Sequence, residues 1–151
     1  MKLYVLDTNI LLHLVRGKQM SQTINNYLQE QEDAQYVISI VSIAEAESVV
    51  KQIGNWSKSK IEKLHSLFEK LTIVDIEAGN VDLLESYVNI DAFSQGKIPS
   101  PNGVMLNNSS RNMGKNDLWI AATTNVLGAV LITTDNDFDH LDNIFFQLKK
   151  F

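Results

Sequence analysis

The sequence has 151 residues, of which 44% are apolar and none is cysteine. This length fits one domain over residues 1–151, and the apolar fraction is typical of a globular protein with a packed core. The lack of cysteine excludes disulfide scaffolds, thiol nucleophiles and cysteine-ligated zinc or iron–sulfur centres. Asp7, Asn9 and His13 interrupt the first apolar run, so no stretch approaches the roughly 18 apolar residues of a membrane span. We therefore expect a cytoplasmic protein without membrane partners.

The charge balance is acidic, with 18 Asp and Glu against 13 Lys and Arg and a formal net charge of −5. This balance argues against a simple basic protein that coats nucleic acid, since such binders carry a surplus of Lys and Arg. It does not exclude an enzyme that acts on nucleic acid, because bound divalent cations reverse the sign of a carboxylate pocket.

The alternation of strand and helix patterns predicts the fold class. In chain order we expect a strand at 2–6, helices at 10–17 and 21–31, a strand at 36–41, helices at 42–54 and 57–71, a strand at 72–76, helices at 80–93 and 117–126, and strands at 129–133 and 144–148. This order indicates an α/β protein with helices on both faces of a parallel sheet. The architecture expected is a three-layer α/β/α sandwich with a mostly parallel sheet of four or five strands.

The segment from Ser94 to Lys115 interrupts this rhythm. It contains both prolines, three of the seven glycines and four asparagines, without periodicity. Irregular segments of this length are usually functional or disordered, and a flexible surface insertion is the alternative explanation. Its charged residues are Lys97, Arg111 and Lys115, with no acid among them. The lysines between residues 58 and 70 are most simply explained as a solvated helix face.

Four acidic residues are predicted to meet at one edge of the sheet. Asp7 ends the first strand, and Glu45 lies in the first turn of the helix after the second strand. Asp117 begins the helix before the fourth strand, and Asp135 follows that strand. In parallel α/β sheets the carboxyl ends of the strands and the amino ends of the helices share one edge, where ligands bind.

Each acid alone has a structural explanation. Asp7 suits the cap of the first helix, and Ser42 with Glu45 matches an S-x-x-E capping box. Asp117 complements the dipole at a helix start, while residues 135–137 have ordinary turn composition. These local roles contribute about 1 kcal/mol each or less, whereas two carboxylates ~4 Å apart repel by about 4 kcal/mol at a dielectric of 20.

A cluster of all four therefore requires a positive counterpart, and no Lys or Arg is interleaved at these positions. A divalent cation is the economical solution, and an all-oxygen ligand set favours Mg²⁺ or Mn²⁺ over zinc. Such cations at a sheet edge suit phosphoryl transfer and phosphodiester hydrolysis.

Four ordered motifs carry a resemblance to a known family. They are Leu6–Asn9 (LDTN), Val41–Glu45 (VSIAE), Asn116–Thr123 (NDLWIAAT) and Leu131–Phe138 (LITTDNDF). Together they resemble the motifs of PIN domains, and more narrowly those of VapC-type toxin ribonucleases of bacterial toxin–antitoxin pairs. The resemblance spans nearly the whole chain.

The resemblance implies a metal-dependent endoribonuclease that uses one or two Mg²⁺ or Mn²⁺ ions, forms a homodimer and is inhibited by a cognate antitoxin. The acidic quartet of the family falls on Asp7, Glu45, Asp117 and Asp135, and its supporting polar positions fall on Asn9 and Thr133. The segment at 94–115 is longer than the short turn of many small members. Its three basic residues could form an RNA-facing lip around the acidic pocket, because phosphate contacts mostly position a substrate.

Two other classes of protein are alternatives to the ribonuclease. The first is a catalytically silent PIN-like module that binds RNA or metal. The second is an aspartyl-phosphate enzyme or receiver domain on a similar sheet. The receiver reading is the weaker, because Asn9 replaces a second acid after the first strand and no lysine follows Thr133 and Thr134.

Overall fold

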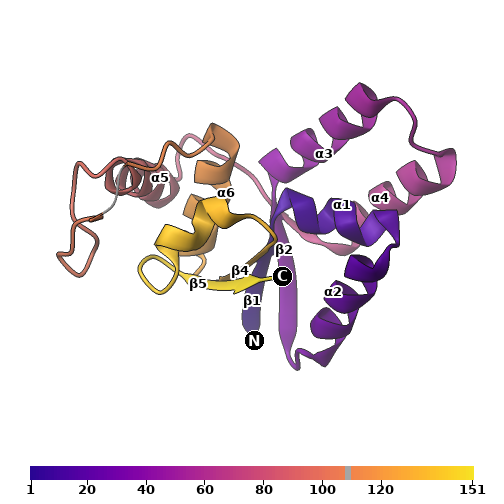
Figure 1. Cartoon of the computed structure of the whole chain (residues 1–151), viewed down its shortest axis with the longest axis horizontal. Helices are drawn as coiled ribbons and strands as arrows, with labels where there is room; N and C mark the ends of the chain where they lie inside the picture. The colour runs from indigo at the N-terminus through magenta and orange to yellow at the C-terminus, as the bar shows by residue number, and fades with distance from the viewer. Residues whose placement is uncertain (108–109) are drawn as a thin grey trace.

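The computed structural model describes residues 1–107 and 110–151 and contains a five-stranded, fully parallel sheet (Figure 1). The order of the strands across the sheet is β3-β2-β1-β4-β5. The strands are β1 (Lys2–Leu6), β2 (Ala34–Ser39), β3 (Thr72–Val74), β4 (Val130–Thr133) and β5 (Gln147–Lys150). From β1 the chain adds β2 and β3 on one side of the sheet and then β4 and β5 on the other side. The order of the strands therefore reverses between β1 and β4, and open α/β sheets bind ligands at such a position.

Helices cover both faces of this sheet, as the sequence predicts (Figure 1). They are α1 (Thr8–Arg16), α2 (Gln19–Glu30), α3 (Ile40–Ile53), α4 (Lys58–Lys70), α5 (Val81–Ser94), α6 (Lys115–Val126) and the 3₁₀ helix η1 (Asn136–Leu141). Helices α1 to α4 supply one hydrophobic core, and α5, α6 and η1 supply the other. The three-layer α/β/α architecture is thus confirmed. Among the described residues, no helix combines the length and the apolar character needed to cross a bilayer.

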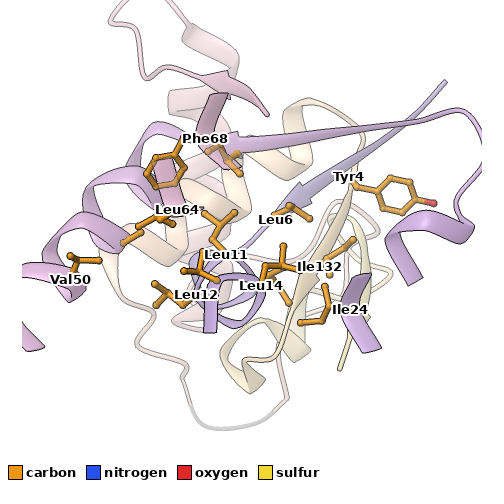
Figure 2. Close-up of a cluster of buried hydrophobic side chains, with 14 of the residues drawn as sticks. Tyr4, Leu6, Leu11, Leu12, Leu14, Ile24, Val50, Leu64, Phe68 and Ile132 are labelled. Atoms are coloured by element: carbon orange, nitrogen blue, oxygen red, sulfur yellow. The ribbon is translucent and has the colours of Figure 1, made fainter. Parts of the chain in front are cut away.

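The two cores follow from the alternation of side chains along the strands. Leu6 and Ile132, on the neighbouring strands β1 and β4, pack beside Leu11 and Leu14 of α1 in the first core (Figure 2). Val5, one residue earlier on β1, faces the opposite core. Because both faces of the inner strands are buried, these strands are apolar throughout.

The start of α3 differs from the prediction. The strand expected at 36–41 occupies 34–39, and Ser39 rather than Ser42 caps the helix by accepting a hydrogen bond from the Val41 amide at 3.4 Å. The capping box of Ser42 and Glu45 is therefore wrong, since Ser42 is buried inside α3 and Glu45 lies in its second turn. The β-branched residues from Ile40 onward favour a strand locally, but the pairing of β2 with β3 ends at Ser39.

The last strand also lies further along the chain than expected, at 147–150 instead of 144–148. Ile144 and Phe145 pack against the second core instead of pairing in the sheet. The parallel register with β4 begins at Gln147.

The irregular segment between α5 and α6 packs against the fold at several described points. A turn runs from Ser100 to Val104, and the Arg111 amide donates a hydrogen bond to the Ser94 carbonyl at 2.6 Å. Met113 is buried in the second core, where Ser94 Oγ lies 3.4 Å from its sulfur. Residues 108 and 109 of the predicted segment lie outside the described residues.

Candidate metal and active site

A pocket of about 510 Å³ opens at the carboxyl ends of β1 and β4, between α1, α3 and the start of α6. Carboxylates from four separate elements line it, together with the side chains of Asn9 and Asn116. The acids are Asp7, Glu45, Asp117 and Asp135. The parallel topology thus brings the four sequence-predicted acids to one pocket.

Asp7 lies at the floor of this pocket and is only 3% exposed. It caps α1, and its Oδ1 accepts a hydrogen bond from the Thr8 amide at 2.7 Å. Thr133 donates from its hydroxyl to Asp7 Oδ2 at 2.6 Å. Because Oδ1 accepts a hydrogen bond from α1 and Oδ2 accepts one from β4, the carboxylate has a fixed orientation.

Thr133 also links Asp7 to the fourth acid. Its hydroxyl oxygen accepts a hydrogen bond from the Asp135 amide at 2.9 Å, in addition to the bond that it donates to Asp7. The side chain is fully buried and does not line the pocket. Thr133 is therefore placed to position two acids, whereas Asn9 is exposed and lines the pocket directly.

Glu45 is oriented from outside its own helix. Thr8 of α1 donates a hydrogen bond from its side-chain oxygen to Glu45 Oε1 at 2.8 Å. Glu47, two residues further on α3, instead contacts His65 of α4 at 2.6 Å. The contact with Thr8 directs Glu45 toward the pocket.

The most closely packed acidic group differs from the predicted quartet. Asp117, Asp135 and Asp137 each offer a carboxylate oxygen, and these oxygens lie within 4.8 Å of one another. Asp117 lies in the first turn of α6, and Asp135 caps η1 by accepting from the Asp137 amide at 2.9 Å. The η1 turn therefore brings Asp137, whose sequence context is that of an ordinary turn, beside the other two acids.

Two of the carboxylates in the pocket have raised pKa values. Burial raises the pKa of Asp7 to about 6, and the charges of Glu45 and Asp135 act in the same direction, although the hydrogen bonds from Thr133 and Thr8 lower it. Burial, followed by the charges of four neighbouring carboxylates, raises the pKa of Asp117 to about 7. The protein alone therefore makes the fully ionised site unfavourable near neutral pH.

The donor set fits a hard divalent cation. No Lys, Arg or His lines the pocket among the residues that the structure describes, so no side chain there neutralises the carboxylates. Carboxylate oxygens are the ligands that Mg²⁺ and Mn²⁺ prefer, and a bound cation would offset the burial and the repulsion that raise these pKa values.

The three basic residues of the predicted lip lie outside this pocket. Lys97 follows the end of α5, Arg111 is exposed in the connecting segment, and Lys115 is the first residue of α6, two positions before Asp117. Of the three, Lys115 is nearest in sequence to the acidic cluster.

Sequence reasoning missed two residues that shape the site, Thr8 and Asp137. The adjacency of Thr8 to Asp7 gives no sign of its bond to Glu45, which is 37 residues away. The D-x-D spacing of Asp135 and Asp137 was a visible signal, but it is equally common in turns.

Fold and site together define a parallel α/β/α domain that gathers carboxylates from several elements in one pocket at the carboxyl ends of its strands. The chain belongs to the PIN domain family, whose model matches residues 4–144. No curated protein matches the sequence.

Several solved structures share the fold. A chain of VapBC2 from Rickettsia felis, bound to a promoter DNA fragment, has a TM-score of 0.70 at 21% identity, covering 99% of this chain and 98% of that one. VapBC-1 from nontypeable Haemophilus influenzae has a TM-score of 0.65 at 24% identity, with coverages of 98% and 97%. VapC20 from Mycobacterium tuberculosis, a sarcin–ricin loop cleaving toxin, has a TM-score of 0.65 at 12% identity, with coverages of 95% and 98%. Because these sequence identities are low, the likeness shows a shared fold.

Proposed function

We propose that this chain is a metal-dependent endoribonuclease that hydrolyses RNA phosphodiester bonds as the toxin of a toxin–antitoxin pair. The observation that carries the proposal is the gathering of four carboxylates, two with strongly raised pKa values, in a pocket that no described cationic side chain lines. Membership of the PIN family supports it, as does the likeness to a toxin that cleaves the sarcin–ricin loop.

In this proposal Asp7, Glu45, Asp117 and Asp135 hold one or two Mg²⁺ or Mn²⁺ ions. Bound divalent cations lower the pKa of a coordinated water and stabilise the leaving oxygen of a phosphodiester. The protein contributes orientation, since Thr133 fixes the Asp7 carboxylate and Thr8 fixes that of Glu45. Asp137 is a further candidate ligand, because its oxygen lies in the closest acidic group.

The proposed partners are an RNA substrate, a cognate antitoxin and a second copy of this chain, acting in the cytoplasm. The likeness to VapBC complexes from two bacteria supports an antitoxin partner. The homodimer follows from the family resemblance of the sequence motifs.

Cleavage of a mixed RNA pool tests the function directly. We expect purified wild-type protein to cut RNA in Mg²⁺ or Mn²⁺ and to stop when EDTA removes the metal. Asp7→Asn is expected to be inactive, because it removes one of the negative charges that attract the divalent cation. Equal cleavage by both proteins would indicate a contaminating nuclease and would favour the catalytically silent binding module.

A second experiment tests whether the three basic residues of the predicted lip bind RNA. Replacing Lys97, Arg111 and Lys115 together by Ala is expected to weaken RNA binding and to flatten its salt dependence, since each lost phosphate contact lowers the slope for single strands by about 0.7. Fluorescence anisotropy with labelled RNA over a series of salt concentrations measures both effects. Unchanged affinity and slope would remove these residues from the binding surface.

A further inference from the structure

A second, basic pocket of about 290 Å³ lies where the ends of α1 and α3 approach the start of α4. Of the six described residues that line it, three are cationic and none is acidic. The lining residues are Arg16, Lys18, Ile53, Asn55, Trp56 and Lys60. Its charge is therefore opposite to that of the carboxylate pocket.

The two pockets adjoin along the same pair of helices. Gln52 lines the carboxylate pocket and the next residue of α3, Ile53, lines the basic one. On α1, Leu12 lines the first pocket and Arg16, one turn later, lines the second. Figure 1 shows α1 and α3 leaving the top of the sheet side by side and running outward to the same side of the molecule. Asp7 and Arg16 are nine residues apart, or about 13 Å along the helix axis.

The chemistry of the basic pocket suits a nucleotide. The Arg16 guanidinium lies 5.9 Å from the centroid of the Trp56 ring, which is itself half-buried against the first core. Ile53 is 49% exposed and adds apolar surface beside this ring. Aromatic and Arg planes bind bases by stacking, while surrounding lysines contact the phosphates.

Lys60 is exposed on α4, in agreement with the solvated helix face that the sequence predicts. Lys58 has a partner on its own helix, Glu62, at 3.9 Å. Lys60 instead lines the pocket together with Lys18, which lies between α1 and α2. Cationic side chains from α1, from α4 and from the connection between α1 and α2 converge here, and no described lining residue is acidic, although their mutual repulsion opposes this arrangement.

We propose that this basic pocket is a second RNA subsite, which holds a nucleotide of the same single strand whose phosphodiester lies in the carboxylate pocket. This inference rests on the proposed function, because it takes RNA as the substrate. The strand follows the α1–α3 surface from one pocket to the other. RNA is the favoured occupant, because the basic pocket combines cationic side chains with a stacking surface and adjoins the carboxylate pocket along α1 and α3.

Binding is tested in protein that carries Asp117→Asn to prevent cleavage and Trp119→Phe to leave Trp56 as the single tryptophan. The probe is a fluorescein-labelled uridine oligonucleotide of about ten nucleotides. We expect RNA to quench the emission of Trp56. Adding Lys18→Ala and Lys60→Ala is expected to weaken binding about tenfold and to lower the salt slope by about 1.4, or 0.7 for each contact.

The matched control removes the same charge elsewhere, with Lys2→Ala at the start of β1 and Lys70→Ala at the end of α4. This control is expected to change affinity less than twofold and to leave the salt slope unchanged. In otherwise wild-type protein, the Lys18→Ala and Lys60→Ala pair is expected to raise KM for the oligonucleotide while leaving kcat unchanged.

The outcomes separate this inference from the proposed function. Wild-type cleavage with unchanged RNA affinity in the Lys18 and Lys60 variant would overturn the subsite alone. Absence of cleavage, with Trp56 quenching and reduced affinity still observed, would overturn the nuclease and retain the RNA site. If the variant instead lost binding to a partner protein and kept its affinity for RNA, the pocket would be a protein interface and the inference would be wrong.

Discussion

Replacing Asp117 by Asn is expected to lower the rate of RNA cleavage about a thousandfold or more at saturating Mg²⁺ or Mn²⁺. The reason is that Asp117 lines the pocket beside the other acids, where the stabilisation that a metal provides amounts to several kcal/mol. Single-turnover cleavage of a labelled RNA measures the effect. The same substitution is expected to stabilise the metal-free protein against urea, because it removes a charge that burial and its neighbours disfavour.

Asp82 provides the matched control for this substitution. It is the acid in the first turn of α5, as Asp117 is in the first turn of α6, but it is exposed and does not line the pocket. Asp82→Asn is expected to leave cleavage unchanged and to cost about 0.3–1 kcal/mol of stability through the helix dipole. If Asp117→Asn behaved like Asp82→Asn in both measurements, Asp117 would serve its helix and not a metal.

The elements that position the site could largely be predicted from the sequence, because their signals are local. A buried apolar run followed by Asp7 gives both the end of β1 and the cap of α1. The alternation of strands and helices gives the parallel sheet, and hence the edge at which the acids meet. Asp117 follows from the same topology, since α6 precedes β4.

The orientation of the acids could not be predicted, because it depends on contacts between distant segments. The sequence pairs Glu45 with Ser42 in a capping box, but Ser39 caps the helix, and the bond that holds Glu45 comes from Thr8 on another element. Thr133 bridges Asp7 across 126 residues. Local patterns contain no information about such pairs until the fold is known.

The free energy of unfolding of the metal-free protein is expected to fall as the pH rises from about 4 to about 7. The ordinary pKa of an Asp is 3.8, whereas those of Asp7 and Asp117 in the folded protein are about 6 and about 7. Within this range the folded state binds more protons than the unfolded state, so raising the pH favours unfolding. For the deeply buried Asp7, the rise of its pKa corresponds to about 3 kcal/mol lost above this range.

Two histidines change the free energy of unfolding in the opposite direction as the pH rises, so their contribution must be separated from that of the carboxylates. Burial lowers the pKa of His13 and of His140, so their contribution to stability increases with pH through the ordinary histidine range. Comparing wild type with Asp7→Asn cancels the histidine contribution, because both proteins retain these side chains. The wild type is expected to lose more stability than Asp7→Asn between pH 5 and pH 7.5, as measured by urea unfolding in EDTA.

Saturating Mn²⁺ is expected to weaken this pH dependence in the wild type. Metal binding requires ionised carboxylates, so cations compete with protons for the site and stabilise the folded protein more as the pH rises. A concentration of one hundred times Kd adds about 2.7 kcal/mol of stability. Asp7→Asn should lose most of this gain, which gives a measure of metal binding that does not depend on catalysis. If the wild type in EDTA gained more stability than Asp7→Asn between pH 5 and pH 7.5, the folded state would not disfavour the ionised Asp7 carboxylate, and the argument for a cation would fail.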